Sequence, residues 1–232
     1  MIDIRPFATL GHADHGWLDA RHHFSFANYH DPDRMGWGSI RVWNDDTIAA
    51  QSGFPPHPHR DMEIVTFVRS GAITHRDSLG NEGRTAAGDV QVMSAGSGIT
   101  HSEYNGSEDE PVWFFQIWID PDREGLEPSY AERSFPEEGQ LGKLTLLAAR
   151  EGAGGALPVH QDIRLFTAVL EPETPVEYAL APDRHAWLQV ARGTVALNGQ
   201  ILTEGDGAAV SEEETLEIAP IESARIFLFD LA

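Results

Sequence analysis

The chain has 232 residues, with 16 Lys or Arg against 37 Asp or Glu, so its formal net charge at pH 7 is −21. Such an acidic chain is a poor candidate for binding nucleic-acid duplexes or anionic membrane surfaces, because both require clustered cationic side chains. The absence of cysteine excludes a disulfide-stapled domain, and no apolar segment approaches the roughly 18 residues of a membrane-spanning helix.

Short strand-like segments follow one another through the first half of the chain. They are rich in β-branched and aromatic residues and occupy 40–43, 63–68, 72–75, 90–93 and 112–119. Turn-like residues end them, as at Asn44-Asp45-Asp46 after the first segment and Asp120-Pro121 after the last. The pattern allows a short helix near 129–133, but no segment keeps a helical period over three turns. Many short strands at this spacing favour a β-barrel or a β-sandwich.

The second half begins with a polar, acidic stretch over 120–143, whose Pro and Gly content is typical of a domain linker. Strand-like segments then resume at 164–170, 185–190, 194–197 and 225–229. The sequence FVRSGAI at 67–73 resembles VARGTV at 190–195, and a Gly-Asp pair follows each of them. We therefore predict an internal duplication of one β domain.

Two pairs of potential metal ligands stand out among the 11 histidines. His57 and His59 form one i, i+2 pair, and His101 and Glu103 form the other. Residues at this spacing on a strand point to the same face, so two neighbouring strands would bring four ligand atoms together. Three imidazoles and one carboxylate suit a divalent transition metal. The alternative is that these are ordinary strand residues facing solvent, which is common for an isolated His-x-His pair.

The residues around both pairs resemble the cupin superfamily. The first cupin motif, with a Gly, His-x-His, a Glu and a Gly, is matched by Gly53, His57, His59, Glu63 and Gly71. The second is matched by Gly88, Gly96, His101 and Asn105, although Ser94 replaces the motif's proline and the stretch before His101 is two residues longer. These departures resemble the pirin family, as do HPHR at 57–60, SAGSGITHSE at 94–103 and the segment from Trp17 to Pro32. The resemblance is strong over about the first 120 residues.

The pirin resemblance implies an all-β bicupin, that is, two tandem antiparallel β-barrels of jelly-roll type with a few short helices. We expect a metal-binding cupin at 1–135 and a degenerate cupin without metal at 136–232. Aligning Gly71 with Gly193 puts Ala179 and Ala181 at the positions of the first histidine pair. Aligning Gly88 with Gly205 puts Ile218 and Pro220 at the positions of the second pair, so one metal site is expected.

The same resemblance implies one divalent transition metal ion held by His57, His59, His101 and Glu103. Fe(II) is favoured, with Zn, Mn, Ni, Co or Cu as alternatives. Glu63 is a ligand in many other cupins and is a rival candidate here, or else a buried carboxylate that orients a ligand. The implied reaction is of the quercetin 2,3-dioxygenase type, in which a flavonol is cleaved by O2 with release of CO, and Glu103 is the candidate base.

A different class of function is also open, namely a regulatory pirin whose metal or redox state controls binding to a protein partner. A third hypothesis is an isomerising cupin that consumes no oxygen. Under the first hypothesis the partners are a flavonol-like small molecule and O2, with no nucleic acid and no membrane. The N-terminal residues lack a signal-peptide pattern, so a cytoplasmic location is expected.

Several other residues have simpler interpretations. The histidines near the N-terminus are expected to be loop and packing residues: His12, His15, His22, His23 and His30. Phe54, Phe67 and Trp118 are candidates to line a pocket. His75, His160 and His185 are assigned no role.

Overall fold

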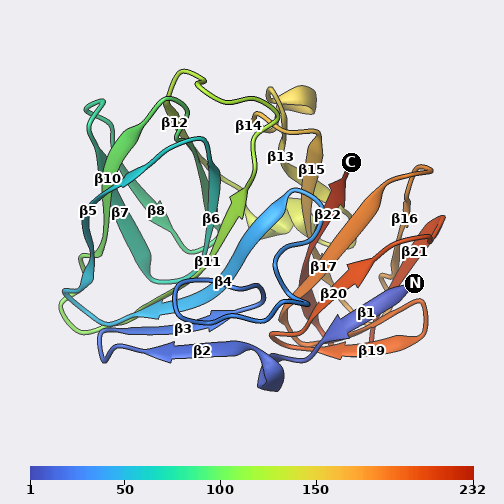
Figure 1. The fold of residues 1–232 in the computed structure, drawn as a ribbon. Helices are drawn as coiled ribbons and strands as arrows, with labels where there is room; N and C mark the ends of the chain where they lie inside the picture. Colours follow the sequence, from blue (N-terminus) through green and yellow to red (C-terminus); the bar gives the residue numbers. More distant parts are fainter. The chain divides into compact units, whose positions relative to one another are not determined.

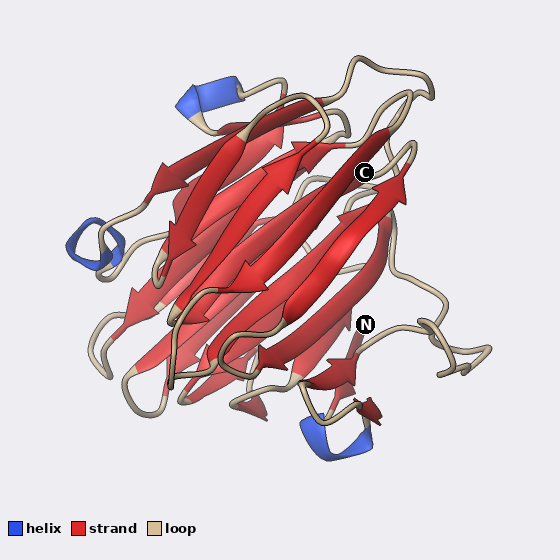
Figure 2. Cartoon of the chain, turned by 90° about the vertical axis from the view of Figure 1, so that its left-hand side faces the viewer, coloured by secondary structure: helices blue, strands red, loops and turns tan.

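The structure, a computed structural model, describes residues 1–232 and consists almost entirely of β-strands (Figure 2). Turns connect its 22 strands, and the helices are the short 3-10 segments η1 (Phe7–Thr9), η2 (Glu137–Gln140) and η3 (Ala153–Gly155). None of these helices has the length and hydrophobicity that crossing a membrane requires. The predicted all-β fold with a few short helices is confirmed.

The chain forms two compact units. The N-terminal unit comprises Gly11–Phe135 and Leu157–Gln161, and the C-terminal unit comprises Met1–Leu10, Pro136–Ala156 and Asp162–Ala232. The first ten residues group with the C-terminal unit because β1 (Ile2–Arg5) pairs with β20 (Gly207–Val210). The expected domain limits, 1–135 and 136–232, stay a prediction, because compact packing does not test independent folding.

The N-terminal unit contains two antiparallel sheets with the orders β12-β9-β6-β11-β4-β3-β2 and β5-β10-β7-β8 (Figure 1). Its strands are β2 (Gly11–Asp14), β3 (Leu18–His22), β4 (Ile40–Ile48), β5 (Gly53–His59), β6 (Glu63–Ser70), β7 (Ala72–Asp77), β8 (Glu82–Ala86), β9 (Asp89–Ser94), β10 (Ile99–Asn105), β11 (Val112–Ile119), β12 (Ser129–Ser134) and β14 (Leu157–Val159).

The C-terminal unit repeats this arrangement with the orders β1-β20-β17-β22-β15-β13 and β16-β21-β18-β19. Its remaining strands are β13 (Thr145–Arg150), β15 (Ile163–Leu170), β16 (Val176–Ala179), β17 (His185–Arg192), β18 (Thr194–Leu197), β19 (Gln200–Thr203), β21 (Thr215–Pro220) and β22 (Ala224–Leu231). The order β9-β6-β11-β4 corresponds to β20-β17-β22-β15, and β5-β10-β7-β8 corresponds to β16-β21-β18-β19. The prediction of two tandem cupin barrels is therefore confirmed.

Equivalent glycines form the turns between β6 and β7 and between β17 and β18. Gly71 has a φ of +74° and Gly193 a φ of +79°, a left-handed conformation that a side chain disfavours. A Cβ atom at Gly193 would also lie 2.2 Å from the carbonyl oxygen of Ser223. This shared requirement explains why the short FVRSGAI-like echo is visible in both halves.

Two local predictions are wrong for the same reason. Residues 44–46 form no turn, because β4 continues through them and pairs on one side with β3 and on the other with β11. Residues 129–133 form no helix but belong to β12, which pairs along its length with β9. In both cases hydrogen bonds to distant strands override the local preference of the sequence.

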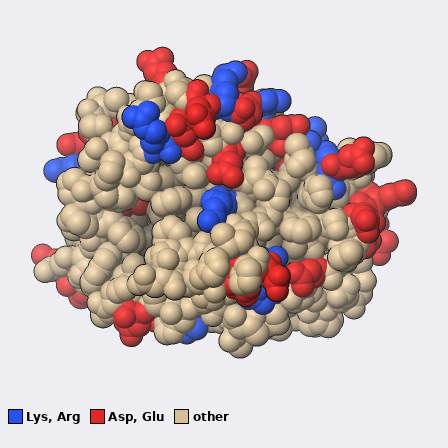
Figure 3. Space-filling view, in the orientation of Figure 1, with Lys and Arg blue, Asp and Glu red and all other residues tan.

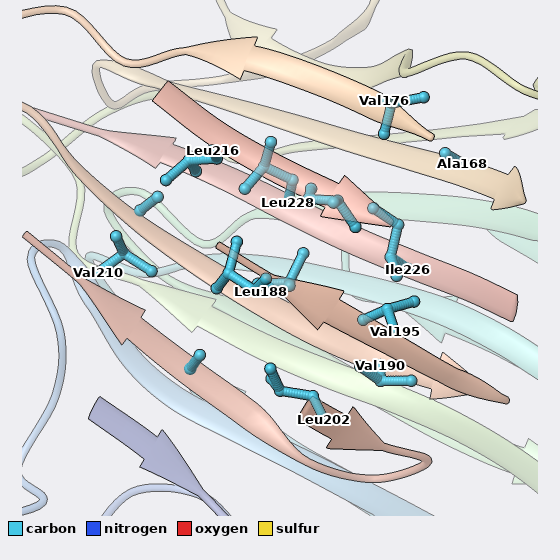
Figure 4. Close-up of a cluster of buried hydrophobic side chains, with 14 of the residues drawn as sticks. Ala168, Val176, Leu188, Val190, Val195, Leu202, Val210, Leu216, Ile226 and Leu228 are labelled. Carbon is cyan, nitrogen blue, oxygen red and sulfur yellow. The ribbon is translucent and has the colours of Figure 1, made fainter. Parts of the chain in front are cut away.

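The core of the C-terminal unit is aliphatic (Figure 4). Leu188, Leu216, Ile226 and Leu228 pack together with no exposed surface. The alternation on β21, with Leu216 and Ile218 inward, is the period of a strand whose one face is buried.

Charged side chains are mixed on the face of the molecule shown in Figure 3, where Lys and Arg lie beside Asp and Glu. Uncharged surface separates these groups. The acidic excess of the sequence is therefore dispersed over this face and forms no single patch there.

Candidate metal centre

The two predicted ligand pairs lie on neighbouring antiparallel strands, β5 and β10. His57 is directly opposite His101, and Glu103 is opposite Phe54. Between these two points the register shifts, so that Pro55 and Pro56 together face Ser102. Proline has no backbone N–H to give to a sheet, and a bulge is where a strand tolerates it. The bulge thus lies between the facing residues His57 and His101 on one side and Glu103 on the other.

Three imidazoles converge beside the bulge. The potential ligand atoms of His57, His59 and His101 all lie within 4.8 Å of one another. The Nε2 atoms of His57 and His101 are 3.1 Å apart. Two nitrogens bound at right angles to a shared ion, each about 2.1 Å from it, would be about 3 Å apart. The spacing therefore fits a divalent metal.

Hydrogen bonds orient two of the rings, His57 and His101, so that their Nε2 lone pairs point toward each other. His57 Nδ1 lies 2.8 Å from the Pro55 carbonyl oxygen, which can only accept, so Nδ1 carries the proton. The Nε2 atom of the buried His75 lies 3.0 Å from Asp77 Oδ2, and its Nδ1 lies 3.3 Å from His101 Nδ1. If His75 donates to Asp77, His101 donates to His75 and keeps an unprotonated Nε2 that faces His57.

The protonation state of two rings also suits metal binding. Burial lowers the pKa of His59 to about 4, with a further contribution from His57. Burial lowers the pKa of His101 to about 2, and its neighbours His57, His59 and His75 add to this shift. Both rings are neutral at pH 7, which is the form that binds a metal.

Glu103 is buried and lies on the His75 side of His101. Its ligand atom forms a close group with those of His75 and His101, and this second group shares His101 with the group of three histidines. Its carboxylate accepts hydrogen bonds of 2.7 Å from the side-chain amides of Gln91 and Gln116. Burial raises the pKa of Glu103 despite these bonds. The structure thus brings Glu103 next to one predicted ligand, and the complete set of four stays a prediction.

Glu63, the rival ligand, belongs to neither group. Its Oε1 accepts a 2.6 Å hydrogen bond from the Ser94 hydroxyl, and its Oε2 accepts one of 3.1 Å from the backbone N–H of His160. Burial raises the pKa of Glu63. Ser94, which replaces the proline of the cupin motif, therefore provides a partner for this buried carboxyl group.

A pocket of about 440 Å³ opens beside the histidines, within the range of small-molecule sites. His57 and His59 line it together with Phe54 and Trp118, as predicted for these two aromatic residues. Phe67 is buried in the core and does not line this pocket. The other lining residues are His12, Ala13, His15, Leu18, Ala20, His22, Phe26, Ala27, Asn28, Tyr29, Asn44, Asp46 and Gln116.

Sequence reasoning missed several of these residues. His12, His15 and His22, which are expected from the sequence to be loop and packing residues, line the pocket, and the pirin-like segment 17–32 contains His22. His75 and Asp77 have the i, i+2 spacing that identified the ligand pairs. Asn44 and Asp46 were not predicted to line a pocket, because residues 44–46 were wrongly predicted to form a turn.

The equivalent strands of the C-terminal unit carry different residues. Glu103 pairs with His75, which is four residues after Gly71, and Ile218 pairs with Leu197, which is four residues after Gly193. The positions of His57, His101 and Glu103 therefore correspond to Tyr178, Leu216 and Ile218. The expected alignment to Ala179, Ile218 and Pro220 is wrong by one or two residues, because the segments between the aligned glycines and these strands differ in length. Both groups of potential ligands lie in the N-terminal unit.

Comparison with known proteins gives consistent matches over the whole chain. A family model described as Pirin matches residues 4–119, and one described as the quercetinase C-terminal cupin domain matches residues 146–231. A quercetin 2,3-dioxygenase from Escherichia coli K12 is 44% identical, with 100% of this chain and 99% of that protein covered. A pirin-like protein from Caulobacter vibrioides is 53% identical, with both chains fully covered. The crystal structure of the bacterial pirin YhhW from E. coli in complex with nickel(II) is 43% identical with a TM-score of 0.95, covering 100% of this chain and 99% of that one.

Proposed function

The chain belongs to the pirin family, and on that premise we propose that it is a metal-dependent dioxygenase that cleaves a flavonol such as quercetin. The observation that carries the proposal is the convergence of three imidazoles beside a pocket of about 440 Å³, with the Nε2 atoms of His57 and His101 3.1 Å apart. Relatives named quercetin 2,3-dioxygenase support this activity.

The metal would be held by His57, His59, His101 and Glu103. A divalent transition metal at this point would act as a Lewis acid toward the flavonol oxygens and enable reaction with O2. Fe(II) is the favoured ion, and the nickel(II) complex of the E. coli relative supports a divalent ion in this family. The residues fit such an ion because the potential ligand atoms of the three rings lie within 4.8 Å of one another and the Nε2 atoms of His57 and His101 face each other.

The pocket would bind the flat rings of the substrate. Phe54 and Trp118 offer apolar faces and edges, and the Trp118 ring also contacts His59 edge-on at 4.9 Å between centroids. Aromatic surfaces of this kind bind planar ligands and displace water from the reacting region. The substrate would thereby be positioned with its 3-hydroxyl toward the histidines.

Glu103 is the proposed base that removes the proton of the flavonol 3-hydroxyl. Its raised pKa, caused by burial, makes it a stronger base than an exposed carboxylate. Each of its oxygens accepts one amide hydrogen bond, which leaves a second lone pair on each. The overall reaction would consume one O2 per flavonol, open the central ring and release one CO.

The test is oxygen uptake together with loss of quercetin absorbance, on protein stripped of metal and reloaded separately with Fe(II), Mn(II), Co(II), Ni(II), Cu(II) or Zn(II). We expect stoichiometric uptake and CO release with at least one ion, and neither with His101→Ala. Absence of uptake with every ion at verified occupancy would contradict the proposal and favour the regulatory hypothesis.

A further inference from the structure

One wall of the pocket carries a buried carboxyl group that the proposed reaction does not use. Asp46 lies on β4, is only 2% exposed and lines the pocket together with His57 and His59. Its Oδ1 atom is buried and has no hydrogen-bond partner. Two other polar side chains of the pocket are paired: Asn44 Oδ1 lies 2.8 Å from His22 Nδ1, and Gln116 donates to Glu103.

The fold offers Asp46 no partner from the neighbouring strands. In the sheet, Asp46 is opposite Ala20 on β3 and Phe114 on β11, and both of these side chains are apolar. The strand needs no carboxyl group here, because its backbone is paired on both sides irrespective of the side chain. A polar group that the fold neither requires nor satisfies, and that lines a pocket, is best explained by a ligand.

The electrostatic surroundings make the unpaired group unfavourable without a ligand. Burial, together with the nearby carboxylates of Asp45 and Glu103, raises the pKa of Asp46 well above its ordinary value. A hydroxyl group in the pocket that donated to the Asp46 carboxyl group would restore the hydrogen bonding that burial removes. No group of the protein donates a hydrogen bond to Asp46 Oδ1.

We propose that Asp46 is a specificity-determining residue that accepts a hydrogen bond from a hydroxyl group of the substrate. This inference rests on the proposed function and narrows the substrate class to flavonols with a hydroxyl group besides the 3-hydroxyl that faces the histidines. The apolar side chains of Phe54 and Trp118 contact the rings of the substrate. Asp46 discriminates between flavonols by their hydroxyl substituents. A flavonol without further hydroxyls leaves the Asp46 carboxyl group without a hydrogen-bond donor.

The experiment measures binding and not turnover. Protein loaded with Zn(II), which has no redox chemistry, is titrated by calorimetry with quercetin and with 3-hydroxyflavone, which lacks the additional hydroxyls. Quenching of tryptophan fluorescence is a second readout, since Trp118 lines the pocket. The variants are Asp46→Leu, which removes the acceptor at similar size, and Asp46→Asn, which keeps an amide oxygen. Asp33→Asn, at an exposed position, is the control for loss of one carboxylate.

We expect Asp46→Leu to weaken quercetin binding roughly fivefold to tenfold and to change 3-hydroxyflavone binding less than about twofold. Asp46→Asn should give a smaller loss for quercetin, and all variants should keep the zinc content of the unmodified protein. Equal losses for both ligands would overturn the assignment of Asp46 while leaving the proposed function intact. If the unmodified protein bound neither flavonol, both the inference and the proposed function would fail.

Discussion

The two units place opposite chemistry on equivalent strands. In the N-terminal unit, β5 and β10 present His57, His101 and Glu103, and β7 beside β10 adds His75. In the C-terminal unit the positions of His101 and Glu103 hold Leu216 and Ile218, which have no exposed surface. The same strand order therefore supports either a polar site or an apolar core, and the barrel alone does not determine function.

The equivalent residues of the two units also differ in their contribution to the stability of the fold. Burying a leucine or isoleucine contributes about 1.5–3 kcal/mol to stability, whereas buried carboxyl and imidazole groups contribute little unless they are paired. The N-terminal unit gives up this apolar contribution where it gathers ligands. A site maintained at the expense of stability is typical of functional regions.

The largest expected effect comes from truncating equivalent residues of the two units in a pair of matched variants. His101→Ala should abolish turnover and metal retention, because it removes the ring that faces His57 at 3.1 Å. Leu216→Ala, at the equivalent position, should keep metal content and lower the free energy of unfolding by about 2–5 kcal/mol. Metal analysis and urea unfolding of both proteins check the contrast, which would disappear if Leu216→Ala also lost metal.

A second variant separates two roles within the N-terminal site. Glu103→Ala should lower turnover of metal-loaded protein by about 100-fold or more, because it removes the proposed base. Metal retention should fall less, since three histidines remain. Turnover is to be compared at equal metal occupancy, and full activity at that occupancy would show that Glu103 is not the base.

The His101 ring should contribute a loss of stability of the metal-free protein in acid. The pKa of His101 is lowered to about 2 by burial, so the folded ring stays neutral while the unfolded ring gains a proton below about pH 6.5. Stability is then present at pH 7 and is lost as pH falls, by about 2 kcal/mol between pH 7 and 5 for this residue. Urea unfolding at pH 7, 6 and 5 measures the loss, and His101→Leu should reduce it.

The smallest expected effect is a gain in stability. The raised pKa of Asp46 means that its ionised form is disfavoured in the folded protein, so Asp46→Asn should stabilise the metal-free protein at pH 7. A gain of about 1 kcal/mol would raise Tm by about 2–4 °C, and it should vanish as pH falls toward 4. Asp33→Asn should leave Tm unchanged. An unchanged Tm for Asp46→Asn would show that the buried Asp46 carboxyl group does not lower the stability of the protein.

Much of the fold and part of the site could be predicted from local sequence. The i, i+2 pairs at His57 and at His101 require only that each segment be a strand, which β5 and β10 confirm. Asp46 could not be predicted, because its placement depends on β4 continuing between β3 and β11, which are distant in sequence. For the same reason the C-terminal register was missed, since only the pairing of Ile218 with Leu197 fixes it.

The prolines of β5 have a further consequence for association. This strand lies at the edge of its sheet, and Pro55, Pro56 and Pro58 leave three of its seven residues without a backbone N–H. A free strand edge is a template onto which another chain can add and start aggregation, and prolines remove the donors that such addition requires. The histidine pair is thus carried on an edge that resists self-association. A proline between the two histidines is compatible with ligation, since imidazoles bind metal and the backbone N–H does not.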